Sequence, residues 1–190
     1  LAALTLGEAL GLSVKDMQRG LERVHTIAGR AERIGNAPFA VIVDYAHTPD
    51  SLRALYETYK NKKIICVLGN TGGGRDTWKR PEMGKVAEEY CSSIYLTNED
   101  PYDEDPRKIV DAIAAGMTQK KPQIILNRRA AIAAALTEAK TLRQTQGNQE
   151  VAVLVTGKGT DPFIMGPRGG KESWSDAQVT REELQKLGYN

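Results

Sequence analysis

An apolar run that ends in a polar turn and a helix start is the feature that most limits how this chain can fold. The run covers residues 39–43, is rich in β-branched residues and ends at Asp44. A helical pattern begins at residue 50, after a turn that contains His47 and Pro49. This order predicts a buried strand followed directly by a helix. Ligands of open α/β sheets bind where strand carboxyl ends meet helix N-termini, so Asp44 and His47 are candidate site residues.

The same alternation of strands and helices continues along the rest of the chain. Strands are expected at residues 63–68, 93–97, 123–126 and 151–156, and helices at 50–59, 81–90, 106–117, 128–140 and 176–187. The alternation predicts an α/β fold, namely a Rossmann-like, doubly wound and mostly parallel sheet with helices on both faces. Two further short runs, 163–165 and 171–174, flank a Pro/Gly turn and predict a hairpin that adds an antiparallel edge strand.

Residues 1–24 are expected to form two short helices ahead of this alternating region. Ser13 with Asp16 three residues later matches a capping box, and apolar residues recur near the helical period. Residues 25–29 are expected to be a linker, followed by a charged cluster before the first strand. The chain begins with Leu rather than Met, so we expect it to be part of a longer protein.

Composition and charge exclude several classes of partner. The net charge of +2 is too small to argue for nucleic acid or an anionic membrane, and 6% aromatic residues provide no stacking platform for single strands. No apolar run approaches the length of a membrane span, and residues 1–12 lack the basic start of a signal peptide. The two cysteines, Cys66 and Cys91, form no zinc or disulfide pattern. We therefore expect a cytoplasmic protein without nucleic-acid or membrane partners.

Polar residues follow four of the expected strands, and the loops after parallel strands share one rim of a sheet. They are Asp44 and His47 after the first strand, Asn70, Thr71, Arg75 and Asp76 after the second, Glu99, Asp100 and Asp103 after the third, and Lys158, Thr160 and Asp161 after the fifth. The glycine-rich loop at 69–76 can turn backbone N–H groups toward an anion, and Arg75, Lys79 and Arg80 favour this over a plain solvent loop. The loop matches neither a Walker A motif nor a dinucleotide fingerprint.

Each of these features also has a purely structural interpretation. Asp44 and His47 could be a helix-capping carboxylate and a surface imidazole, rather than groups that bind a ribose and stack on a base. The acidic loop after the third strand could be solvated, rather than a receptor for a cationic amine. Trp78 and Trp174 are expected to be partly buried packing residues. Cationic, glycine-rich and acidic loops on one rim together indicate an amino-acid-like ligand beside an anionic one.

Five motifs give the chain a resemblance to a known family. They are GRAERI at 29–34, VDYAHTPDSL at 43–52, GGGRDTWKRPEMG at 72–84, TNEDPYDEDP at 97–106 and TGKGTDPF at 156–163. Their order and spacing resemble the C-terminal domain of the Mur ligases, most closely those that add the third residue of the peptidoglycan stem peptide. By this resemblance, residues 1–24 are the last helices of a central ligase domain, 25–29 a hinge and 30–190 the C-terminal domain.

The resemblance implies an ATP-dependent ligase that joins an amino acid to UDP-MurNAc-dipeptide through an acyl phosphate. The N-terminal and central domains would be partners in the same protein, with Mg²⁺ held mainly by the central one. We therefore expect no metal ligands and no activity in this chain alone. By matching motifs, ATP would be bound by Arg30 at its phosphates, Asp44 at its ribose and His47 at its adenine. The amino acid would be bound by Arg75, Glu99, Asp100, Tyr102, Gly157 and Asp161.

The departures from the family pattern concern the incoming amino acid. Relatives that add diaminopimelate carry Asp-Asn-Pro-Arg where this chain has Glu99, Asp100, Pro101 and Tyr102, so the arginine for the second carboxylate is absent. An acidic loop suits a lone side-chain ammonium, as in lysine or ornithine, with diaminopimelate as the alternative. The competing hypotheses for the chain are a non-catalytic binding module of the same fold and a folylpolyglutamate synthetase-like activity.

Overall fold

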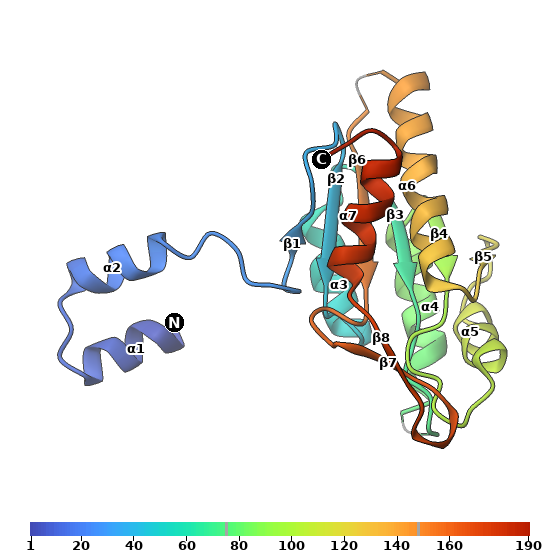
Figure 1. Cartoon of the computed structure of the whole chain (residues 1–190), viewed down its shortest axis with the longest axis horizontal. Helices are drawn as coiled ribbons and strands as arrows, with labels where there is room; N and C mark the ends of the chain where they lie inside the picture. Colours follow the sequence, from blue (N-terminus) through green and yellow to red (C-terminus); the bar gives the residue numbers. More distant parts are fainter. Residues whose placement is uncertain (75, 148) are drawn as a thin grey trace.

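A mixed, mostly parallel sheet forms the centre of the computed structural model, which describes residues 1–74, 76–147 and 149–190 (Figure 1). The strands are β1 (Glu32–Arg33), β2 (Ala40–Asp44), β3 (Lys63–Leu68), β4 (Ser93–Leu96), β5 (Gln123–Ile124) and β6 (Val151–Thr156). Their order across the sheet is β1-β2-β6-β3-β4-β5. All neighbours pair in parallel except β1, which is antiparallel to β2. The predicted doubly wound, mostly parallel sheet is confirmed.

Helices cover both faces of the sheet and bury two separate apolar layers. They are α3 (Pro49–Thr58), α4 (Lys79–Tyr90) and α5 (Pro106–Ala114) on one face, and α6 (Arg128–Thr145) and α7 (Asp176–Lys186) on the other. Successive residues of a strand supply the two layers in turn. In β6, Val153 and Val155 belong to the layer of α6 and α7, whereas Ala152 and Leu154 belong to the other. Every residue of β6 is buried, which explains its unbroken apolar run.

The turn between β2 and α3 is fixed by a capping box. Thr48 Oγ1 accepts a hydrogen bond from the Ser51 N–H at 3.2 Å, and Ser51 Oγ accepts from the Thr48 N–H at 3.0 Å. Pro49 occupies the first turn of α3, where its missing N–H has no cost. The His47 N–H also donates to Ser51 Oγ, at 3.2 Å. The local sequence therefore holds His47 in a defined place just beyond the end of β2.

An antiparallel edge strand is present, but it is β1 and not the C-terminal hairpin. Strands β7 (Phe163–Met165) and β8 (Lys171–Ser173) pair with each other in a separate two-stranded sheet, so the expectation that the hairpin extends the main sheet is wrong. The hairpin is held instead by the loop after β4. Met165 accepts a backbone hydrogen bond from Tyr102 at 3.0 Å and donates one to Asp100 Oδ1 at 2.8 Å.

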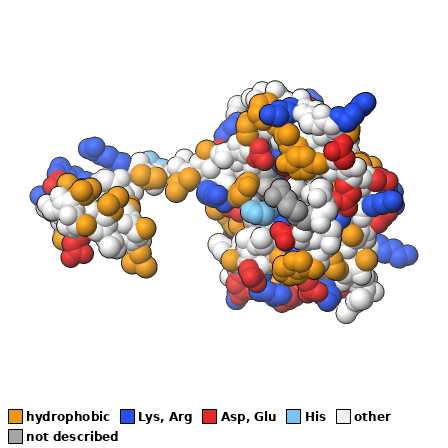
Figure 2. Space-filling model, turned by 90° about the horizontal axis from the view of Figure 1, so that it is seen from below, with side chains coloured by type: hydrophobic (Ala, Val, Ile, Leu, Met, Phe, Trp, Pro, Cys, Tyr) orange, Lys and Arg blue, Asp and Glu red, His pale blue; other side chains and the backbone are white. Residues whose placement is uncertain are grey.

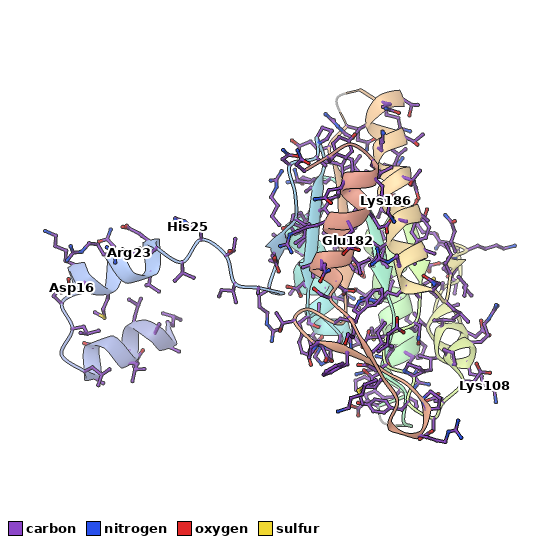
Figure 3. All side chains as sticks on the ribbon, viewed as in Figure 1. Asp16, Arg23, His25, Lys108, Glu182 and Lys186 are labelled. Atoms are coloured by element: carbon purple, nitrogen blue, oxygen red, sulfur yellow. The ribbon has the colours of Figure 1, made fainter. Side chains whose placement is uncertain are left out.

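Helices α1 (Ala2–Ala9) and α2 (Val14–Glu22) form a pair that stands apart from the α/β body (Figures 1 and 2). Ser13 caps α2 as predicted, because its hydroxyl oxygen accepts from the Asp16 N–H at 3.1 Å. An extended segment that contains His25 joins the pair to the body (Figure 3). Apolar side chains are exposed on this part of the chain: Leu4, Leu6, Leu10, Leu12, Val14, Leu21 and Val24. Across the described residues, no helix is long and apolar enough to cross a membrane.

Candidate functional site

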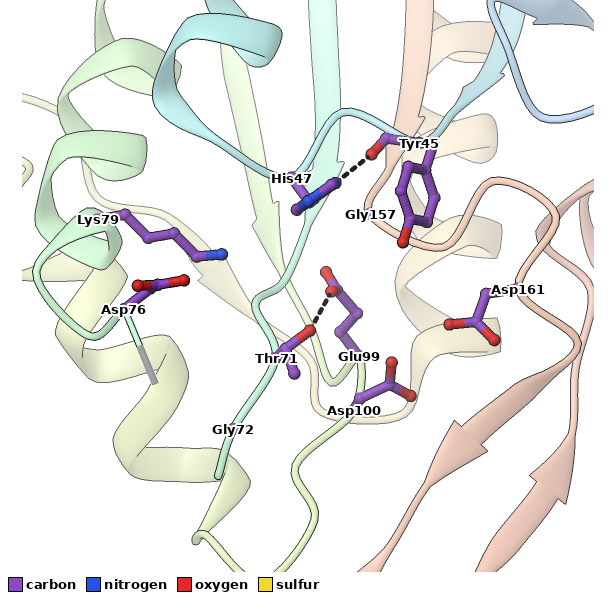
Figure 4. Close-up of a pocket in the computed structure, with 10 residues that line it drawn as sticks. All are labelled: Tyr45, His47, Thr71, Gly72, Asp76, Lys79, Glu99, Asp100, Gly157 and Asp161. Carbon is purple, nitrogen blue, oxygen red and sulfur yellow. Dashed lines mark hydrogen bonds between the residues drawn. The ribbon is translucent and has the colours of Figure 1, made fainter. Parts of the chain in front are cut away.

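Loops after four neighbouring strands meet in a hollow at the carboxyl ends of β2, β6, β3 and β4 (Figure 4). This rim hollow has a volume of about 180 Å³. Its lining residues are Tyr45, His47, Thr71, Gly72, Asp76, Lys79, Glu99, Asp100, Gly157 and Asp161. Figure 2 looks onto this end of the body, where acidic and basic side chains are mixed. The predicted convergence of polar loops on one rim is confirmed.

Asp44, the last residue of β2, accepts hydrogen bonds from two backbone N–H groups. Its Oδ2 accepts from Ala31 at 2.6 Å and its Oδ1 from Ala46 at 2.7 Å. The bond to Ala31, which adopts a φ of 45°, ties the segment after Gly29 to the strand. The carboxylate is half-buried, and each of its oxygens keeps a second lone pair. It can therefore still accept a hydrogen bond from a ligand hydroxyl.

Arg30, Tyr45 and His47 form a cluster at the edge of the rim hollow, in which the two rings meet edge to face. The Arg30 guanidinium lies 4.6 Å from the Tyr45 ring centroid, and the Tyr45 and His47 centroids lie 4.7 Å apart at an interplanar angle of 66°. His47 Nδ1 lies 2.7 Å from the Tyr45 carbonyl oxygen, which can only accept, so Nδ1 carries the hydrogen. In the neutral imidazole, Nε2 is then an acceptor. This cluster places the permanent positive charge of Arg30 beside two aromatic rings.

Lys158 is fully buried and neutralises the Asp100 carboxylate. Its Nζ donates to both Asp100 oxygens, at 2.7 and 2.8 Å, and to Asp161 Oδ2 at 3.0 Å. Asp100 Oδ1 also accepts from the Met165 N–H. The ammonium group that this part of the acidic loop holds is therefore one of the protein's own. These contacts fix the loops after β4 and β6 to each other and to β7.

Glu99 has a buried carboxylate oxygen that accepts no hydrogen bond from the described residues. Its side chain is buried, its Oε1 accepts from the Thr71 hydroxyl at 3.1 Å, and its Oε2 has no partner among the described residues. The carboxylate points into the hollow (Figure 4). Gly157, at a φ of 111°, lies so close that an added Cβ would collide with Oε2. An unpaired buried oxygen costs free energy, which a hydrogen-bond donor on a ligand would recover.

Burial raises the pKa of Glu99, and the positive charge of Arg128 opposes this only in part. An unfolded chain releases this proton near pH 4.5, whereas the folded carboxyl holds it to higher pH. Unfolding therefore releases a proton in this window, and the wild-type chain loses stability as pH rises from 4.5 through the folded pKa.

Glu99→Gln is expected to remove this pH-dependent loss of stability. Urea unfolding between about pH 4 and pH 7 should show the stability of the Gln variant, relative to wild type, increasing with pH. Glu104→Gln is a contrasting control, because Arg80 lowers the pKa of Glu104 and its effect has the opposite sign. A stability difference for Glu99→Gln that is the same across the range would contradict the raised pKa.

The glycine-rich loop after β3 contributes Thr71, Gly72 and Asp76 to the rim hollow, and the first residue of α4 contributes Lys79. Arg80 was expected to favour an anionic ligand together with its neighbours, and this expectation is wrong. It is 3% exposed and donates to both Glu104 oxygens, at 2.6 and 2.9 Å. Arg75 lies outside the described residues, so its contact with a carboxylate stays a prediction.

Tyr102 and Asp103, in the loop after β4, do not line the rim hollow. Tyr102 has a φ of 50° and bonds through its N–H to β7, while Asp103 Oδ1 accepts from the Arg168 N–H at 2.7 Å. The role of Tyr102 in substrate binding stays a prediction. Within the described ranges, no group of three or more His, Cys, Asp or Glu side chains is arranged to hold a metal ion.

The sequence analysis missed Tyr45 as a site residue and predicted no partner for Lys158. Tyr45 stands between Asp44 and His47, so its place in the same short turn is a signal that could have found it. The partner of Lys158 is 58 residues away in the sequence, at Asp100. No local sequence pattern predicts this ion pair, because it depends on the order of the strands in the sheet.

Comparison with known proteins identifies the family to which this chain belongs. Residues 29–159, more than half of the chain, match the family model described as "Mur ligase, glutamate ligase domain". The chain belongs to the Mur ligase family. The matched region contains every lining residue of the hollow of this Mur ligase domain from Tyr45 to Gly157, and Asp161 follows two residues beyond it.

Curated relatives and solved structures agree with this Mur ligase assignment. The UDP-N-acetylmuramoyl-L-alanyl-D-glutamate--2,6-diaminopimelate ligase of Aquifex aeolicus is 39% identical over 187 residues, covering 96% of this chain and 36% of the relative. The ligase of the same name from Gloeobacter violaceus is 38% identical over 193 residues, covering 98% of this chain and 37% of the relative.

A solved structure of a ligase with that name has a TM-score of 0.71 at 26% identity, covering 100% of this chain and 38% of that one. Folylpolyglutamate synthase of Mycobacterium tuberculosis, with a TM-score of 0.61 at 21% identity over 95% of this chain and 37% of that one, shares the fold. The chain spans little more than a third of the length of these relatives.

Proposed function

We propose that this chain is the C-terminal domain of an ATP-dependent amide ligase that adds the third amino acid to UDP-MurNAc-dipeptide. The observation that carries the proposal is the buried Oε2 of Glu99, which has no hydrogen-bond partner in the part of the chain that the structure describes and faces a hollow built by four rim loops. An oxygen in this position suits a cationic amine, because a charged donor recovers the cost of its burial. The relatives' names support a ligase whose incoming substrate brings such an amine.

The proposed binding of ATP rests on the cluster of Arg30, Tyr45 and His47 beside the rim hollow. Arg30 offers a guanidinium for phosphate oxygens, Asp44 can accept from ribose hydroxyls, and His47 presents a flat ring to adenine. These residue types fit a nucleotide. ATP supplies the phosphoryl group that activates the substrate carboxylate, and this chain's residues bind and orient it. Mg²⁺ is assigned mainly to the central domain.

The incoming amino acid is proposed to be a basic one with a second amino group. Lys158 pairs with two of the carboxylates of the rim hollow, Asp100 and Asp161, which leaves those of Asp76 and Glu99 to face a ligand. Among the described side chains drawn there, Lys79 is the cation that projects into the hollow. A further carboxylate on the ligand would meet like charges here, which favours lysine or ornithine. Diaminopimelate, the substrate in the relatives' names, is the second candidate.

The domain organisation is proposed from the same relationship. Helices α1 and α2 would complete a central ligase domain, which would cover the exposed apolar side chains of this pair. Residues 25–29 would be the hinge, and the last of them, Gly29, is held to the body by a bond from its N–H to Glu32 at 2.9 Å. Closure about this hinge would bring Arg30 onto ATP bound by the central domain. The protein would act in the cytoplasm.

The test is amide formation by the protein that carries this chain after its two preceding domains. It would be supplied with ATP, Mg²⁺ and UDP-MurNAc-dipeptide, and with L-lysine, ornithine or meso-diaminopimelate in turn. We expect ADP release that requires an added amino acid, with lysine or ornithine turned over faster than diaminopimelate. Faster turnover of diaminopimelate would overturn the substrate preference. No turnover with any of them would favour a non-catalytic binding module.

A further inference from the structure

A second, larger hollow adjoins the rim hollow and is bordered by an exposed tryptophan. This aromatic hollow has a volume of about 620 Å³ and lies between the starts of α3 and α4. Its lining residues are His47, Thr48, Pro49, Asp50, Arg53, Asp76, Trp78, Lys79, Glu82 and Val86. Trp78 is 67% exposed, so the expectation that it is a partly buried packing residue is wrong. Trp174, by contrast, packs against the core as expected.

The charges around the aromatic hollow argue against a strongly anionic occupant. Three carboxylates, those of Asp50, Asp76 and Glu82, border it alongside two cationic side chains. One of these cations, Arg53, is engaged by Glu89 at 2.7 Å. A phosphate placed here would be repelled by the carboxylates, whereas a neutral ring with amino hydrogens could donate to them.

The apolar surfaces of the aromatic hollow suit a flat ring. Trp78 offers the largest aromatic face in the chain to solvent, and Pro49 and Val86 add apolar surface to the lining. Stacking on an aromatic side chain is the general means by which proteins hold a nucleobase without reading its sequence. His47 presents a second ring at the border with the rim hollow.

We infer that Trp78 is a nucleobase-binding residue, and that the aromatic hollow takes the purine ring of the nucleotide with Trp78 stacked on it. The two hollows share His47, Asp76 and Lys79, so one ligand can extend between them. The base would occupy the aromatic hollow while the phosphates extend toward Arg30, on the other side of the Tyr45 and His47 rings. This inference rests on the proposed binding of ATP.

The inference is tested by tryptophan fluorescence and calorimetry. The chain has two tryptophans, so the Trp174→Phe variant reports on Trp78 alone. Adding ATP, or adenosine, should quench its emission, whereas inorganic tripolyphosphate should not. In Trp78→Ala, affinity for ATP and adenosine should fall about fivefold to a hundredfold, the range expected when a base loses its stacking partner. Affinity for tripolyphosphate should stay unchanged.

The controls separate this inference from the proposed function. Trp174→Phe alone should bind ATP as wild type does, since Asp176 keeps both hydrogen bonds from Arg128 after losing the one from Trp174. Trp78→Ala should melt at the wild-type temperature, because an exposed side chain leaves no cavity. Calorimetric ATP binding with unchanged Trp78 emission, or equal affinity in Trp78→Ala, would overturn the role of Trp78 and leave the proposed function standing. No ATP binding by the wild-type protein that carries this chain after its two preceding domains would overturn both.

Discussion

Lys158→Met is expected to lower the free energy of unfolding by about 3–5 kcal/mol, the usual cost of removing one partner from a buried ion pair. The side chain of Lys158 is fully buried, and its ammonium makes three hydrogen bonds to Asp100 and Asp161. Methionine fills a similar volume but donates nothing, so Asp100 is left buried with only the Met165 N–H. Chemical denaturation at neutral pH measures the loss.

The matched control for this variant is Lys186→Met. Lys186 also donates to a carboxylate three residues away, that of Glu183 at 2.7 Å, but its own side chain is 65% exposed. Its removal should change stability by less than about 1 kcal/mol, because an exposed cation contributes little and the buried Glu183 carboxylate keeps its hydrogen bond from Arg129. A loss for Lys158→Met as small as that of the control would contradict the burial and pairing of Lys158.

Arg128→Met is expected to have an effect of the same size, about 3–5 kcal/mol, for the same reason. The Arg128 guanidinium is buried at the start of α6 and donates to both oxygens of Asp176, at 2.8 and 2.6 Å. It also donates to the carbonyl oxygens of Asn98 and Thr156, at 3.3 and 2.8 Å. The single side chain thus joins the loop after β4, the end of β6 and the start of α7.

The neighbouring residue supplies the control for Arg128. Arg129 follows in the same helix turn and pairs with Glu182 and Glu183, but its side chain is 40% exposed. Arg129→Met should therefore cost less than about 1 kcal/mol. Equal losses for the two arginine variants would show that position in the helix, rather than burial of the ion pair, decides the result.

The strands of the sheet could be predicted because each is an apolar run that needs no distant information. The predicted bounds of β3 and β6 match the observed ones, 63–68 and 151–156. Strand β1 was missed because it is two charged residues long and is formed by pairing with β2. The hairpin was wrongly expected to extend the main sheet, because its position depends on the side chain of Asp100, far away in the sequence.

The candidate site could likewise be predicted only in part from the sequence. The rule that loops after parallel strands share a rim was enough to bring His47, Glu99 and Asp161 together. This rule does not predict which carboxylates form ion pairs with cations of the protein itself. Asp100 is paired with Lys158 and Glu99 is not, and that difference arises from contacts between separate loops. The exposure of Trp78 was missed because one aromatic residue without a periodic pattern is compatible with either burial or a site.

The measurement that tests the central claim most directly is the Michaelis constant for the amino acid in the Glu99→Gln variant of the multidomain ligase. Loss of a charged hydrogen bond should raise the KM for the amino acid about 10- to 100-fold and leave the KM for ATP unchanged. Asp103→Asn, in the same loop but outside the rim hollow, should change neither constant. A KM for the amino acid that stays at the wild-type value in Glu99→Gln, or a rise in the KM for ATP instead, would contradict the claim that this hollow receives the incoming amine.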